Sequence, residues 1–160
     1  MLYDIRAAIP EEATILSSLA LRSKAYWGYS QEFLNACRQE LSVSPEDIEN
    51  EVYQHAVAEH DGKIFGFYTL KFLSGVKFEL EALFVEPDHI GTGVGRALMN
   101  HAYHSARAQG GTVIIIQSDP FAARFYEAAG GVLIGKKESG SIPGRYLPLY
   151  EIIVTSGCKN

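Results

Sequence analysis

The chain has 160 residues, of which 47% are apolar, and this length and composition exclude intrinsic disorder. Fourteen basic residues against nineteen acidic ones give a net charge of −5, which disfavours nucleic acid as a partner because phosphates attract basic surfaces. No segment has the ~20 continuous apolar residues of a membrane span or the apolar core of a signal peptide. We therefore expect a cytoplasmic protein without a membrane partner, with a single domain over residues 1–160 and a flexible tail at residues 155–160.

The first third of the chain predicts one strand followed by helices. Apolar and polar side chains alternate over residues 2–7, which indicates a strand. A helix is expected after Pro10, and a second over residues 33–41 carries Cys37 as a small apolar residue. The segment 44–47, Ser-Pro-Glu-Asp, has the N-cap, first-turn proline and acidic residue of a short third helix.

The remainder predicts strands first and then an alternation of helices and strands. A hairpin turn, His60-Asp61-Gly62, separates two strand-like runs, and a third run leads toward a glycine-rich segment. The expected strands are 55–59, 63–72, 77–85, 112–117, 132–135 and 147–154, and the expected helices are 93–108 and 120–129. Antiparallel neighbours followed by helical crossovers predict an α/β fold of the α+β type, with a mixed, mostly antiparallel sheet flanked by helices.

Three alternating glycines, Gly91, Gly93 and Gly95, lie between a predicted strand end and a helix start. Glycine allows the backbone to approach a ligand closely, so that consecutive N–H groups turn toward one anion at the positive end of the helix. The pattern therefore favours a phosphate or pyrophosphate site, and a tight turn without a ligand is the alternative. The spacing fits neither the dinucleotide fingerprint nor the nucleotide-triphosphate loop.

Two segments together resemble a known family. Residues 90–95, Ile-Gly-Thr-Gly-Val-Gly, are similar to the pyrophosphate loop Gln/Arg-x-x-Gly-x-Gly/Ala of the GNAT superfamily of acyl-CoA-dependent N-acetyltransferases. Residues 119–130 are similar to its Asn-x-x-Ala-x-x-(Leu/Phe)-Tyr-Glu-x-x-Gly segment. The resemblance implies a GNAT-like fold, with acetyl-CoA as cosubstrate and no metal. Ile90 and Asp119 depart from the family pattern, since Arg or Gln and Asn are usual there.

The resemblance also implies which residues hold the cofactor. The strand before the loop would hydrogen-bond the pantetheine arm through its backbone, and the loop would hold the pyrophosphate, with Arg96 as a charged donor or as a solvated arginine. The implied cofactor-binding residues are Leu83, Phe84, Val85, Ile90, Gly91, Thr92, Gly93, Val94, Gly95, Arg96, Asp119, Ala122 and Phe125.

Acetyl transfer to an amine needs a base for the amine, donors for the oxyanion and a proton for the leaving thiolate. The resemblance implies that Tyr126 is the general acid, and a packed core tyrosine is the alternative. Glu79 and Glu81 share one strand face because strands have a period of two. One of them is expected to act as the base, or both form a polar face that attracts cationic amines.

The acceptor pocket is expected to contain aromatic residues from the region around the first two helices, although core packing is an equal reading. These residues are Tyr26, Trp27, Tyr29 and Phe33. Arg145 is expected on the surface, and contact with the acceptor or with an anion is the alternative. His101 and His104 are expected on a solvated helix face rather than at a metal site.

The sequence thus predicts an N-acetyltransferase that moves acetyl from acetyl-CoA directly to a primary amine of a small molecule or peptide in a ternary complex. A non-catalytic acyl-CoA-binding regulatory protein and a structural subunit with an empty glycine turn are the alternatives. The late strands offer exposed edges through which a homodimer could form.

Overall fold

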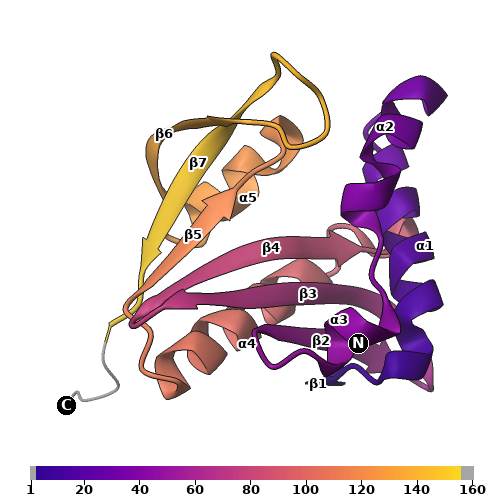
Figure 1. Ribbon diagram of the computed structural model, residues 1–160. Coiled ribbons are helices and arrows are strands. Elements are labelled where there is room, and N and C mark those ends of the chain that lie inside the picture. The colour runs from indigo at the N-terminus through magenta and orange to yellow at the C-terminus, as the bar shows by residue number, and fades with distance from the viewer. Residues whose placement is uncertain (1–2, 156–160) are drawn as a thin grey trace.

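A seven-stranded sheet with the order β1-β2-β3-β4-β5-β7-β6 organises the computed structural model, which describes residues 3–155 (Figure 1). The β4–β5 pair is parallel, and all other neighbouring strands are antiparallel. This confirms the predicted mixed, mostly antiparallel sheet. The strands are β1 Asp4–Ala7, β2 Tyr53–His60, β3 Lys63–Ser74, β4 Lys77–Val85, β5 Val113–Gln117, β6 Val132–Glu138 and β7 Tyr146–Ile153.

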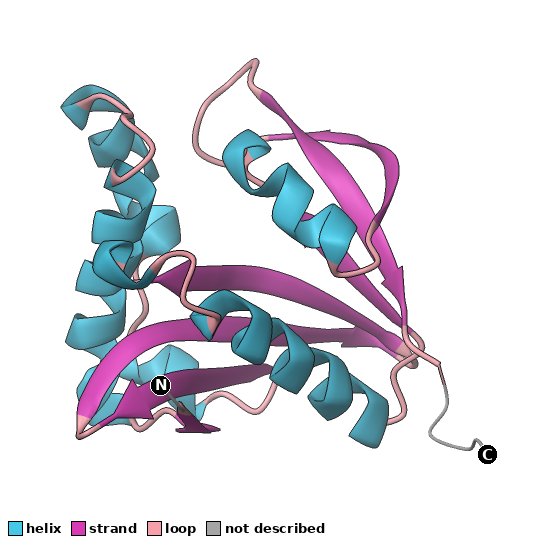
Figure 2. Ribbon diagram, turned by 180° about the vertical axis from the view of Figure 1, so that it is seen from behind, coloured by secondary structure: helices cyan, strands magenta, loops and turns pink. Residues whose placement is uncertain are grey.

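Helices cover both faces of this sheet. Helices α4 and α5 lie on the face seen in Figure 2, and α1 and α2 lie on the other. Two buried apolar clusters follow this division, since α4 packs on one cluster and α1 on the other. The helices are α1 Ala13–Ala25, α2 Gln31–Leu41, α3 Pro45–Glu49, α4 Val94–Ala108 and α5 Ala123–Ala128, and 3-10 turns occupy Pro10–Glu12, Pro87–His89 and Pro120–Ala122.

The close packing of α4 on the sheet depends on Gly66 in β3. A Cβ built on Gly66 would lie 2.9 Å from Leu98 Cδ1 and 2.9 Å from the Phe84 carbonyl oxygen. A methyl group at that position would have to displace both the helix side chain and the strand backbone. The absence of a side chain at residue 66 therefore sets how closely α4, and the loop that precedes it, approach β3 and β4.

The sheet divides between β4 and β5. These strands pair only where Lys77 to Glu79 face residues 113–115. Beyond this point the β3–β4 register shifts, because Leu70 faces Leu80 whereas Thr69 faces Ala82, and Glu81 is the extra residue of a β-bulge. The two strands then diverge, as Figure 1 shows. Consequently the β5-side edge of residues 80–85 has no strand partner among the described residues.

Most predicted elements are confirmed within a few residues of their expected ends. The short helix after Ser44 is present with its complete capping box, and Cys37 is buried on α2. The prediction of a solvated face for His101 was wrong, because its Nδ1 lies 2.8 Å from the hydroxyl of Tyr68 on the underlying β3. The sequence shows the spacing of His101 and His104 on the helix, but it does not show that the Tyr68 hydroxyl lies beneath His101.

Three further expectations concern the ends and edges of the molecule. One continuous sheet supports the single-domain organisation, which stays a prediction; of the predicted tail, residues 156–160 lie outside the described part of the chain. Edge strand β6 is exposed along its whole length, and dimerisation through it also stays a prediction. None of the helices described between residues 3 and 155 is both long and apolar enough to cross a membrane.

Candidate active site

A cavity of about 1010 Å³ occupies the space where β4 and β5 diverge. One wall consists of the second half of β4, the glycine loop and α5, and the other includes the end of α1, the α2–α3 region and β2. The cavity therefore brings together the two motif segments, which are separated in sequence by α4 and β5.

The glycine loop forms one end of this cavity. Gly91 and Gly93 adopt positive φ values of 87° and 98°, and Gly93 is the left-handed N-cap of α4. The Ala97 N–H donates to the Gly93 carbonyl at 3.0 Å, so the N–H groups of residues 94–96 precede the helical hydrogen-bond ladder. Free N–H groups at the positive end of a 15-residue helix make this loop suitable for an anion.

The predicted cofactor residues differ in what they present to the cavity. The Thr92 side chain donates instead to the His89 carbonyl at 2.6 Å, and the Val94 side chain is fully buried in the core. Thr92 and Val94 are thus placed to contribute backbone groups only. The residues that line the cavity are Leu83, Phe84, Val85, Ile90, Gly91, Gly93, Gly95, Arg96, Asp119, Ala122 and Phe125.

Tyr126 lies on α5 in the wall of the cavity and is 7% exposed. Burial, and secondarily the negative charge of Asp119, raise the pKa of its phenol well above the ordinary value of 10.0. Tyr126 is therefore uncharged at neutral pH and lies in the wall of the cavity.

The two strand carboxylates, Glu79 and Glu81, both line this cavity, although the bulge at Glu81 interrupts the strand alternation from which their shared face was predicted. Glu81, the bulge residue, has a 34% exposed side chain and lies 3.9 Å from the Lys71 ammonium. Burial and the charge of Glu79 raise the pKa of Glu81, while Lys71 opposes this effect. A carboxylate with a raised pKa binds a proton more readily, which suits a general base.

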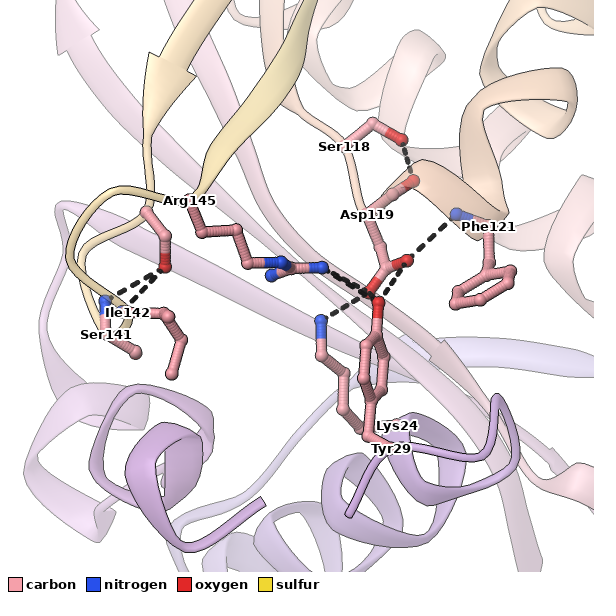
Figure 3. A network of polar contacts seen from close by, with 9 residues as sticks. Lys24, Tyr29, Ser118, Asp119, Phe121, Ser141, Ile142 and Arg145 are labelled. Atoms are coloured by element: carbon pink, nitrogen blue, oxygen red, sulfur yellow. Dashed lines mark hydrogen bonds and ion pairs between the residues drawn. The ribbon is translucent and has the colours of Figure 1, made fainter. Parts of the chain in front are cut away.

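Asp119 holds together three segments that are distant in sequence (Figure 3). Its carboxylate accepts hydrogen bonds from Lys24 Nζ at 2.5 Å and from the Tyr29 hydroxyl at 2.9 Å, and Arg145 Nη2 lies 3.8 Å away. It also accepts from the Phe121 N–H at 2.9 Å, which caps the following 3-10 turn. Burial alone would raise the pKa of Asp119, but the hydrogen bond and charge of Lys24 outweigh it, so the pKa is lowered.

The expectation that Arg145 lies on the surface was wrong. Its side chain is 20% exposed, it donates to the Tyr29 hydroxyl at 2.8 Å, and it lies over the rings of Tyr29 and Phe33. Sequence position in a glycine-rich loop gave no sign of these contacts, because they join residues more than 100 positions apart.

The four predicted acceptor aromatics are in different positions. Trp27 lines the cavity and stacks on Phe121 with ring centroids 5.3 Å apart. Tyr29 and Phe33 stack on each other at 4.1 Å beside the Asp119 network. Tyr26 is 53% exposed and contacts the edge of Trp27. Tyr26, Tyr29 and Phe33 do not line the cavity. Their role toward an acceptor stays a prediction.

Several polar residues of the cavity wall were missed by the sequence analysis. His55 and Thr69 could have been found from strand alternation, because they share a strand face with Val57 and Phe67. Lys24, Glu40 and Asp47 had no local signal, since helix packing alone brings them to the cavity. Among residues 3–155, no three His, Cys, Asp or Glu side chains are grouped as a metal site requires.

Comparison with known proteins identifies the scaffold. Residues 14–139 match the family model of the acetyltransferase (GNAT) domain. The chain belongs to the GNAT acetyltransferase family. It is therefore an acetyltransferase, as the two sequence motifs predicted.

Two curated relatives and one solved structure illustrate the breadth of similarity. This chain is 28% identical to the 5-NmdU N-acetyltransferase of Pseudomonas phage PaMx11 over 137 residues, and this alignment covers 85% of this chain and 91% of the relative. It is 29% identical over 154 residues to the peptidyl-lysine N-acetyltransferase YjaB of Salmonella typhimurium, covering 96% and 99%. The PaiA N-acetyltransferase of Thermoplasma acidophilum, in complex with coenzyme A, has a TM-score of 0.79 and 21% identity, covering 96% and 99%. This likeness confirms the predicted GNAT-like fold.

Proposed function

We propose that this GNAT acetyltransferase moves the acetyl group of acetyl-CoA directly to a primary amine of a small molecule or peptide within a ternary complex. The observation that carries the proposal is the common cavity of the glycine loop, the protonated Tyr126 and the two carboxylates. The proposal also includes a cytoplasmic location, which was expected from the sequence, and the homodimer that the exposed late strands could form.

The features that would hold acetyl-CoA are two backbone surfaces. The unpaired edge of β4 at Leu83 to Val85 offers N–H and C=O groups to the pantetheine arm, as an added strand would use them. The N–H groups from Gly91 to Arg96 face the pyrophosphate. Ile90 supplies no charge here, so backbone donors provide most of the binding. The Asp119 carboxylate already accepts hydrogen bonds from Lys24 and Tyr29. We therefore expect it to contact the cofactor only as part of the cavity wall.

Proton transfer is the part of the reaction that the chain's own side chains perform. When bound, acetyl-CoA supplies the activated acyl group. Glu81, with Glu79 as the alternative, accepts the amine proton directly or through a water molecule. Tyr126, which lines the same cavity, donates its proton to the departing thiolate as that negative charge develops. No covalent acyl-enzyme is required in this scheme.

The acceptor is the least restricted part of the proposal. The relatives act on 5-NmdU and on peptidyl-lysine according to their names, and both reactions are N-acetylations. We propose that Trp27, which lines the cavity, contacts the acceptor. Tyr29 and Phe33, which stack on each other outside the cavity wall, would shape that side indirectly, with Tyr26 against the edge of Trp27.

Thermal unfolding with and without excess acetyl-CoA tests the cofactor site first. A ligand that binds only the folded state stabilises by about 2.7 kcal/mol at a hundredfold excess over Kd. Gly93→Asp should abolish this shift by placing a negative charge in the loop. Gly75→Asp is the matched control, because both glycines have positive φ and open space around an added Cβ, but Gly75 lies in the β3–β4 turn.

Thiol release during an amine screen then tests catalysis. Release with a primary amine is the expected result. A cofactor-induced shift without turnover on any amine would favour the regulatory alternative, and no shift at millimolar acetyl-CoA would overturn the proposal.

A further inference from the structure

Lys71 on β3 places a primary amine of the chain itself beside the carboxylate that we propose as the base. Lys71 pairs with Tyr53 on β2 and with Glu79 on β4, and residues directly opposite one another in a sheet share one face. Tyr53 and Glu79 both line the cavity, so Lys71 lies on the cavity side of the sheet. Its ammonium is 3.9 Å from a Glu81 carboxylate oxygen and 5.7 Å from the centre of the Tyr53 ring.

The surroundings of Lys71 differ from those of Lys24, which also borders the cavity. Lys24 is held by Asp119 at 2.5 Å, and these two side chains are only 12% and 14% exposed. Lys71 and Glu81 are 32% and 34% exposed. An ion pair between partly exposed groups at 3.9 Å is weak, so the Lys71 side chain is free to change its orientation and to give a proton to its neighbour.

The proposed cofactor site directs the acyl group toward the same place. The glycine loop, which would hold the pyrophosphate, follows the end of β4, and the pantetheine arm would run along the unpaired edge from Val85 back to Leu83. An arm that continues in this direction brings its acyl end toward Glu81, which precedes Leu83 in the strand. The Lys71 amine is already held beside Glu81 and needs no separate binding step to meet this end.

We propose that Lys71 is an autoacetylation site, modified by the enzyme's own transfer reaction. The inference rests on the proposed acetyl transfer and adds a product made by the same site. Glu81 takes one proton from the Lys71 ammonium, and the freed lone pair forms the N–C bond to the acetyl carbonyl carbon. The C–S bond then breaks, Tyr126 protonates the departing sulfur, and the second proton lost by the nitrogen passes through water to restore the phenol. The products are a neutral acetamide at Lys71, free CoA thiol and the proton on Glu81.

Mass spectrometry of the intact protein and its peptides, after incubation with acetyl-CoA and no added amine, tests the inference. We expect one acetyl group at Lys71, added at least about tenfold faster than at Lys63, an exposed lysine of the same strand. Lys71→Arg should abolish this modification and keep the charge, because a guanidinium stays protonated. Lys63→Arg is the matched control and should leave it unchanged. Dilution of the protein at constant acetyl-CoA should not change the rate constant, since the transfer is intramolecular.

Two outcomes of the labelling experiment would overturn the assignment. Equal rates at Lys71 and Lys63, or a rate at Lys71 that Glu81→Gln leaves unchanged, would indicate uncatalysed acetylation. A rate constant proportional to protein concentration would indicate transfer between chains. If an external amine releases thiol while Lys71 stays unmodified, the inference fails and the proposed function stands. If Lys71 is acetylated but no external amine releases thiol, the autoacetylation site stands and transfer to an external acceptor fails.

A titration without acetyl-CoA tests the contact on which the inference depends. Burial and the charge of Glu79 raise the pKa of Glu81, and Lys71 opposes them. In Lys71→Gln, whose neutral amide resembles the acetylated side chain, the pKa of Glu81 followed by carbon NMR should be higher than in the wild type. Lys63→Gln should not change it. An unchanged pKa of Glu81 in Lys71→Gln would show that the ammonium does not lie beside Glu81, and would overturn the inference.

Discussion

Replacement of Asp119 by Asn should destabilise the protein strongly, because it removes one partner of a nearly buried ion pair. The Lys24 and Asp119 side chains are 12% and 14% exposed, and their charged atoms are 2.5 Å apart. Loss of one member of a fully buried pair costs about 3–5 kcal/mol, and the remaining exposure reduces this to about 2–4 kcal/mol. The amide oxygen of Asn can still accept from the Phe121 N–H, so the turn cap is retained.

Thermal and urea unfolding at pH 7 measure this effect. For a chain of this length the expected loss corresponds to a Tm decrease of about 4–16 °C. Asp88→Asn is the control, because Asp88 is exposed and should change stability by no more than about 0.5 kcal/mol. Adding Lys24→Met to the Asp119 variant should recover part of the loss, since no unpaired ammonium then remains.

The same variant has a defined pH signature. The folded-state pKa of Asp119 is lowered, so its stabilising contribution is complete above the unfolded-state pKa of about 3.9 and is lost as pH falls through the lower folded-state value. The stability difference between wild type and Asp119→Asn should therefore be constant near neutral pH and shrink in strong acid. A difference no larger than that of the Asp88 control at pH 7 would refute the reasoning.

Three further outcomes follow from the structure. Tyr126→Phe should lower turnover by roughly tenfold or more without weakening the acetyl-CoA-induced thermal shift, and unchanged thiol release would return Tyr126 to a packing role. Gly66→Ala should destabilise by about 1–3 kcal/mol in urea unfolding because the new methyl group meets Leu98, and a neutral result would mean that α4 shifts freely. If Glu81 is the base, its raised pKa places the acid limb of the pH–rate profile above the ordinary glutamate pKa of about 4.3, and the rate falls as pH decreases. Glu81→Gln should remove that limb. An unaltered profile would assign the role of base to another group.

Local patterns were sufficient to predict most of the scaffold. The alternation of apolar residues located the strands, and the glycines at 91, 93 and 95 located the loop, because both properties depend on neighbouring residues. The short α3 was equally predictable, since its capping box lies within four consecutive residues.

Tertiary features of the site were not accessible in the same way. The bulge at Glu81 depends on how β4 leaves β5 to follow β3, which no spacing within β4 records. The partners of Asp119 are 95 residues away at Lys24 and 90 residues away at Tyr29. The sequence shows Asp at position 119 in place of the usual Asn, but only the structure shows that Lys24 is its cationic partner.

The division of the sheet also has a mechanical meaning. The two halves are joined at one end by the three β4–β5 residue pairs, whose backbone hydrogen bonds do not titrate. On the other side of the cavity they are joined by charged side chains around Asp119, with Lys24 on one half and Arg145 on the other. The two halves are therefore joined by backbone pairing at one end of the cavity and by titratable side chains at the other. We expect strong acid, which protonates Asp119, to loosen this side of the cavity, whereas salt should have little effect because the ion pair is nearly buried.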